Sequence, residues 1–214
     1  PLLNSLPPNV TEVNITMGFP LKYAPISSLF EQLFNLHINF KNRFYYKDIL
    51  SIVNHPIIQS FWRVEMQKLI ATIYKENLTY ISYPEIKELV QIEVHELLDL
   101  VFLDLKDNPK EAISSFKKLI FIIKKQHSTD KILLETLFSF HSMFSKLEQL
   151  LDSYSHVQTI KTLLGLYKDL ISATTLDFKG QPFKGLQIMG MLESRVLDFE
   201  NVIIASVNEG TLPA

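Results

Sequence analysis

The chain has 214 residues, enough to bury a sizeable core in one large domain or two small ones. Apolar residues make up 47% and charged residues 21%, a balance typical of a folded globular protein rather than a disordered one. The 21 basic and 23 acidic side chains give a net charge of -2, so any contact with DNA phosphates has to be local.

The residue types and segments that the sequence lacks indicate where in the cell the protein is expected. Without cysteine, the chain has no disulfide, thiolate zinc site or cysteine nucleophile, which fits a reducing cytoplasm. No apolar run reaches the roughly 18 residues of a membrane helix, and no signal peptide is visible. We expect a cytoplasmic protein without a membrane partner. Because the sequence begins at Pro1 and stops at Ala214 directly after a strand-like run, we also expect it to be part of a longer protein.

Strand-like segments occur only near the two ends of the chain. They are Val13–Met17, Leu186–Gly190 and Val202–Ser206. The last is almost continuously apolar and β-branched, which predicts a central strand covered on both faces of a parallel sheet. We expect the strands of the two ends to form one small parallel β piece.

The stretch between these strands has helical periodicity almost throughout. Helices are predicted over Ile26–His37, Tyr46–Val53, Phe61–Tyr74 and Pro84–Leu105. Another begins at Asn108-Pro109, where a capping residue precedes a proline. The apolar face of this helix leaves four lysines largely outside, which fits either a solvated face or a contact with nucleic acid: Lys117, Lys118, Lys124 and Lys125.

The clearest helix is predicted over Asp130–Tyr154. Its apolar residues from Leu133 to Tyr154 are spaced by four and three, and the same spacing returns from Val157 to Ile171. The polar break between them favours an antiparallel helical hairpin. Trp62 and the many phenylalanines are interpreted as core residues rather than as a platform on which bases stack.

Motifs for catalysis and cofactor binding are missing or incomplete. No G-x-x-x-x-G-K-[ST] phosphate loop and no G-x-S-x-G elbow is present. The segment His95–Asp99 has aspartate where a zinc helix has its second histidine. Glu85–Lys87 and Asp177–Lys179 match half of a PD-(D/E)xK nuclease motif, but the chain contains no Pro-Asp dipeptide. We therefore expect no cofactor, no metal site and no catalytic residue.

The C-terminal segment resembles the second motor domain of superfamily I helicases. That family has a loop reading roughly T-x-H-x-x-K-G-L-E-F, then a buried strand, then G-x-x-E-G-x-F-P. The same frame appears here without a gap as Gly190–Phe199, Val202–Ser206 and Asn208–Pro213. Gly190 and Leu192 replace the threonine and histidine with which the family touches DNA and couples it to the nucleotide.

The remaining loop positions are only partly altered. Arg195 keeps a cation where the family has lysine, whereas Val196 replaces a glycine that allows a tight turn. The resemblance therefore implies a motor segment that folds but does not couple DNA to ATP. Its candidate DNA contacts are Gly190, Ser194 and Arg195.

The whole pattern is most similar to the AddB-like proteins, which have an inactivated motor and a nuclease domain. The N-terminal residues Leu2–Pro7 and Val13–Leu21 resemble the segment leading into the helical insertion of that family, and Phe44–Leu50 resembles the start of the insertion. The resemblance implies that residues 1–22 and 181–214 belong to the second motor domain and residues 23–180 to the helical insertion. The expected fold is α+β, mostly α, with a long helical hairpin flanked by the parallel β piece.

These expectations lead to one main functional hypothesis and two rivals. The main hypothesis is a non-catalytic segment that guides DNA in a helicase-nuclease for recombination or repair, with DNA and a partner subunit as its partners. The first rival is a helical scaffold that binds another protein through the Leu133–Tyr154 seam. The second is a metal-dependent nuclease that uses Asp177 and Lys179.

Overall fold

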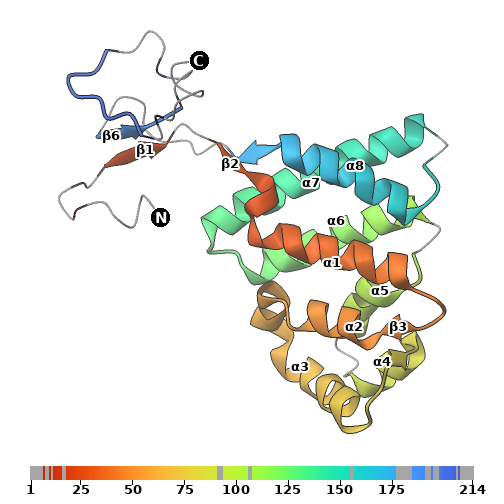
Figure 1. Cartoon of the computed structure of the whole chain (residues 1–214). Coiled ribbons are helices and arrows are strands. Elements are labelled where there is room, and N and C mark those ends of the chain that lie inside the picture. The colour runs from red at the N-terminus through yellow and green to blue at the C-terminus, as the bar shows by residue number, and fades with distance from the viewer. Residues whose placement is uncertain are drawn as a thin grey trace. The chain divides into compact units, whose positions relative to one another are not determined.

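The structure of the protein is a computed structural model. It describes residues 7, 10, 12–15, 18–90, 94–105, 108–154, 157–176, 185–190, 194, 198–205 and 207. Within these residues the chain is mostly helical with short strands, which confirms the predicted fold class (Figure 1). It divides into two compact units, one made of residues 1–18 and 177–214 and the other of residues 19–176.

The first unit is organised around a pair of parallel strands from the two ends of the chain. Strand β1 (Val13–Ile15) pairs with strand β6 (Leu186–Ile188), with Asn14 opposite Gln187. The N–H of Leu186 donates to the Glu12 carbonyl at 2.9 Å, and the Asn14 side-chain amide donates to Gln187 Oε1 at 2.7 Å. The small parallel β piece expected from the sequence is therefore confirmed.

The expected buried strand at Val202–Ser206 is wrong for the residues that the structure describes there. Residues 202–205 form no strand, and Ile203 has 94% of its surface exposed. A strand buried on both faces needs neighbours at its edges and layers above and below it. In the described part of this unit, β1 and β6 are the only strands and they pair with each other. The β-branched residues of this segment favour extended backbone, but a strand also needs a neighbouring strand with which to form hydrogen bonds. Ser206 lies outside the described residues.

The second unit is a helical bundle with two very short strand pairs. Strand β2 (Phe19–Pro20) pairs antiparallel with β5 (Thr175–Leu176), and β3 (Phe44–Tyr45) pairs antiparallel with β4 (Tyr80–Ile81). These pairs were not expected, because two residues carry no detectable period. The helical elements are η2 (Leu21–Tyr23), α1 (Pro25–Asn39), α2 (Tyr46–Val53), α3 (Pro56–Lys75), α4 (Tyr83–Leu89), α5 (His95–Phe102), α6 (Pro109–Gln126), α7 (Lys131–Ser153) and α8 (Ile160–Ala173).

Side-chain caps fix where several of these helices begin. The Asn108 side chain accepts a hydrogen bond from the Glu111 N–H at 3.2 Å, as its sequence context predicts. Asp130 and Thr159 cap α7 and α8 in the same way. Helix α3 begins at Pro56, earlier than the predicted Phe61, because the His55 ring caps it and proline occupies its first turn.

The single helix predicted over Pro84–Leu105 is wrong, because the structure has two helices there. Helix α4 ends at Leu89, and Val90 is extended with φ −115° and ψ 147°. Val90 and Val94 are both buried, at 6% and 5% exposure. Extended backbone suits a β-branched valine, and the break allows both valines to reach the core. A continuous apolar pattern could not reveal this interruption.

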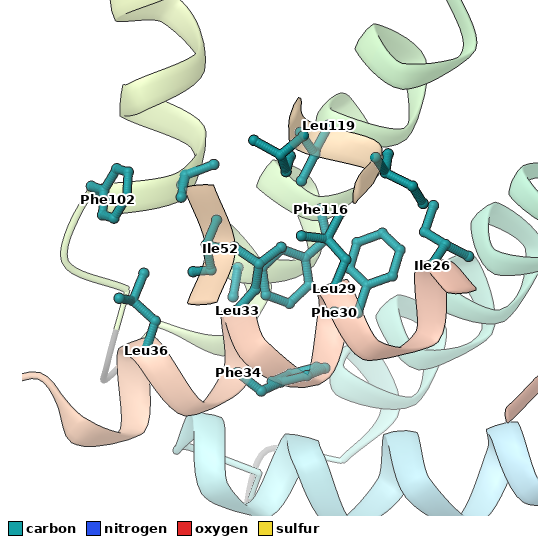
Figure 2. Packing of buried hydrophobic residues seen from close by; sticks show 14 of the residues in the cluster. Ile26, Leu29, Phe30, Leu33, Phe34, Leu36, Ile52, Phe102, Phe116 and Leu119 are labelled. Atoms are coloured by element: carbon teal, nitrogen blue, oxygen red, sulfur yellow. The ribbon is translucent and has the colours of Figure 1, made fainter. Parts of the chain in front are cut away.

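Helix α1 is the centre of the core. It lies between α8 and α2 (Figure 1), and its apolar side chains meet those of α2, α5 and α6 (Figure 2). The Phe30 ring lies 5.6, 5.3 and 4.8 Å from those of Phe116, Phe140 and Phe144. Trp62 is also buried, with 8% exposure, which agrees with its interpretation as a core residue.

Helix α7 packs antiparallel to the preceding helix, α6. Lys110 pairs with Asp152, Lys117 with Glu148 at 2.8 Å, and the Phe121 ring lies 5.3 Å from that of His141. Helix α8 follows α7 as predicted and contacts it through stacked Phe144 and Tyr167 rings. Helices α7 and α8, which correspond to the predicted hairpin, therefore pack together with a third helix, α6.

Two glycines give opposite expectations on substitution by alanine. Gly185 has a φ of +68°, and a Cβ there would lie 2.1 Å from the Glu12 carbonyl oxygen. Gly185→Ala should therefore part β1 from β6 and speed amide exchange at Leu186. In α8, a Cβ on Gly165 would meet nothing within 4 Å. Gly165→Ala should raise the free energy of unfolding by roughly 0.5–1 kcal/mol in thermal melts. An unchanged exchange rate at Leu186 in Gly185→Ala would contradict the first expectation.

Candidate nucleic-acid interface

The helicase-like loop is described in part. The N–H of Ser194 donates to the Gly190 carbonyl at 3.3 Å, and both residues are half-buried. The structure therefore brings these two predicted contact residues together in a turn. Arg195, the third predicted contact, and Leu192 and Val196 lie outside the described residues. The role of this loop in DNA contact stays a prediction.

The predicted lysine face of α6 is present, but its members differ in their pairing. Lys117 donates to Glu148 of α7 at 2.8 Å and is mostly covered, with 21% of its side chain exposed. Lys118, Lys124 and Lys125 are exposed, and no ion pair involves them in the part of the chain that the structure describes. Three cations on one helix thus remain available to an anionic partner.

Two exposed phenylalanines accompany these lysines. Phe121 lies on the same outward side of α6 and is 56% exposed, and Phe138 on α7 is 71% exposed. His141, one turn after Phe138, contacts the Phe121 ring at a centroid distance of 5.3 Å. We call this surface the aromatic-lysine face; it consists of Lys118, Phe121, Lys124, Lys125, Phe138 and His141.

The phenylalanines of this face were missed in the sequence, where aromatic residues were assigned to the core. A signal was available for Phe121. At 100° per residue it falls within about 60° of all the outward lysines, opposite the buried Phe116 and Leu119. Its position in the helical period, rather than its residue type, indicated exposure.

The acidic and histidine motifs considered in the sequence have structural partners. Glu85 caps α4: its carboxylate accepts from the Ser82 N–H at 2.6 Å and from Arg43 at 3.0 Å. The hydrogen bonds from Ser82 lower the pKa of this carboxyl. Lys87 pairs with Asp99 at 2.8 Å, and the His95 ring lies 3.0 Å from the Lys87 carbonyl. These residues stabilise α4 and α5, whereas Asp177 and Lys179 lie outside the described residues.

Ser28 of α1 and His55 before α3 form a serine–histidine pair like a nucleophile beside a general base, but their hydrogen bonds are those of a helix cap. His55 Nδ1 accepts from the Ile57 N–H at 3.3 Å, so the ring proton resides on Nε2, which faces Ser28 Oγ at 2.9 Å. Ser28 donates its own proton to the Pro25 carbonyl at 2.8 Å. In this tautomer His55 donates to Ser28, and the pair serves to hold the start of α3 against α1. Desolvation also lowers the pKa of His55 and keeps the ring neutral.

A second such pair borders a pocket of about 300 Å³ at the start of α3 and α7. Ser60 Oγ lies 2.9 Å from His127 Nε2 but donates to the Ile57 carbonyl at 2.6 Å. Asp130, on the same rim, caps α7 through the Leu133 N–H. The polar groups of this pocket are therefore engaged in holding helix ends, and the rest of its lining is mainly apolar.

The described residues contain no cluster of three histidine or acidic side chains that could hold a metal ion. None of the helices in the described ranges is both long and apolar enough to cross a membrane. No protein-family model matches the chain, and searches of curated proteins and of solved structures found no match either.

Proposed function

We propose that the chain is a non-catalytic, DNA-guiding segment of an inactivated, superfamily I helicase-like subunit. That subunit would act in the cytoplasm with a partner subunit in a helicase-nuclease that processes DNA ends. The helical unit would be the insertion, and the strand pair with the loop that follows it would belong to the second motor domain. The longer protein would supply nuclease activity outside this segment.

The parallel pairing of β1 with β6 is the observation that carries this proposal. Asn14 and Gln187 are 173 positions apart in sequence, yet their strands are neighbours with the same direction. A helical unit that leaves and re-enters one parallel sheet is the expected layout of an insertion in an α/β motor domain. Parallel neighbours require such a crossover, whereas a terminal hairpin does not.

The scaffold alternative has less support in the form that the sequence suggested. The seam of α7 is occupied by the core of its own unit. Its buried members are Leu137, Phe140, Phe144, Leu147 and Leu151. Leu133 is partly buried, and only Tyr154, at 52%, is exposed. A partner helix could not reach the seam without unfolding the bundle.

Binding and turnover assays on the 214-residue chain test the proposal together. We expect it to bind single-stranded or forked DNA in fluorescence anisotropy, and to hydrolyse neither ATP nor DNA when magnesium is added. ATP or DNA turnover abolished by a point substitution in this chain would contradict a non-catalytic role. Failure to bind either DNA at low ionic strength would contradict the guiding role.

A further inference from the structure

We propose that the aromatic-lysine face of α6 and α7 binds single-stranded DNA, with its lysines on phosphates and its exposed rings on bases. This inference rests on the proposed DNA-guiding function and assigns it a surface and a form of DNA. The surface is separate in sequence from the helicase-like loop at residues 190–199.

Charge selects an anionic ligand for this surface. Lys118, Lys124 and Lys125 are exposed, and the acids of α7 that pair with α6, Glu148 and Asp152, are matched to Lys117 and Lys110 instead. Unpaired ammonium groups on one side of a helix attract phosphates by releasing condensed counterions. The protein needs such a local patch, because its net charge is -2.

The exposed rings favour single-stranded DNA over other anions. Phe121 exposes 56% of its surface on the lysine side of α6, and Phe138 exposes 71% on α7, one turn before the His141 ring that contacts Phe121. An exposed phenylalanine ring forgoes the free energy of burial, which bases stacked on it would supply. Unpaired bases stack on such rings, whereas bases in a duplex stack on one another and leave only backbone accessible. An acidic protein segment would satisfy the lysines but would not require flat aromatic surfaces.

The lysines are tested by their effect on the salt dependence of binding. The variant Lys118→Gln/Lys124→Gln/Lys125→Gln should bind an oligothymidylate more weakly than the unsubstituted chain. The slope of log K against log salt should fall in magnitude by about 2, since each single-strand phosphate contact contributes roughly 0.7. The control Lys68→Gln/Lys161→Gln/Lys168→Gln removes three exposed lysines of α3 and α8 and should leave the slope unchanged.

The rings are tested by comparing oligothymidylate with an abasic oligomer of equal length. Phe121→Ala and Phe138→Ala should each weaken binding of oligothymidylate roughly tenfold, as expected for one lost stacking contact, and leave binding of the abasic oligomer unchanged. The control Tyr74→Ala removes an aromatic side chain of α3 that is 62% exposed and should have no effect. In Phe121→Trp, the fluorescence of the new indole should be quenched by oligothymidylate and not by the abasic oligomer.

Several results would overturn the inference. DNA binding that survives the lysine and phenylalanine substitutions would contradict this surface while leaving the DNA-guiding function intact. Equal losses in the control variants would do the same. Tighter binding of polyglutamate than of oligothymidylate, with no difference between oligothymidylate and the abasic oligomer, would assign the face to an acidic protein partner. If the unsubstituted chain binds no DNA, the proposed function itself fails.

Discussion

Phe30→Ala is expected to lower the free energy of unfolding by about 3–5 kcal/mol, the range for removing a buried phenylalanine from a packed core. Phe30 is 0% exposed, and three other rings lie within 5.6 Å of its centroid. These rings come from α6 and α7, so the alanine leaves a cavity where α1 meets both helices. Chemical denaturation of the 214-residue chain, followed by circular dichroism, measures the loss.

The matched control is another phenylalanine of the same bundle. Phe138 is 71% exposed, so Phe138→Ala should change stability by no more than about 0.5 kcal/mol. A loss below about 1 kcal/mol in Phe30→Ala, or similar losses in the two variants, would contradict the position of α1 at the centre of the core.

Acid is expected to destabilise the helical unit through His37. This residue of α1 is 0% exposed, and no hydrogen bond reaches either ring nitrogen among the described residues. Desolvation by burial lowers the pKa of His37 from 6.5 to about 4. The unfolded chain therefore binds a proton at a higher pH than the folded chain does. Stability is fully present above pH 6.5 and is lost as the pH falls towards 4, by about 3 kcal/mol at most.

The variant His37→Leu separates this effect from other titrations. It removes the buried polar nitrogens, so stability at neutral pH should be unchanged or higher. Between pH 6.5 and 4 its stability should fall less steeply than that of the unsubstituted chain. His141→Leu, on the partly exposed side of α7, serves as the control and should keep the steep fall. Parallel pH profiles for His37→Leu and the unsubstituted chain would contradict the assignment.

Local sequence signals predicted much of the helical unit because each has a local physical cause. Asn108 and Asp130 are capping residues at the starts of α6 and α7. The spacing of apolar residues along α7 indicates which side of the helix faces the core. The break at Val90 and the exposure of Ile203 depend on what surrounds those residues. In the local sequence, a valine that reaches the core through extended backbone looks the same as a valine inside a helix. Likewise, an apolar run without a partner strand looks the same as a buried strand.

In the candidate interface, too, some features could be predicted from the sequence and others depend on how the helices pack. The lysines of α6 could be placed outward from periodicity, but the pairing of Lys117 with Glu148 depends on how α7 docks. The exposed Phe121 ring meets His141 of α7, one turn after the exposed Phe138, only through that docking. The role of Glu85, by contrast, has a local cause. Ser82 precedes it by three residues, and the two form a capping box at the start of α4 that can be recognised in the sequence.

The salt dependence of DNA binding tests the central claim most directly. We expect the affinity of the 214-residue chain for an oligothymidylate to fall linearly on a log–log plot as salt is raised from about 50 to 200 mM. The slope should have a magnitude of about 2 or more, corresponding to at least three phosphate contacts at roughly 0.7 each. A dissociation constant that does not change with salt, or no binding at about 50 mM salt, would contradict a DNA-guiding role.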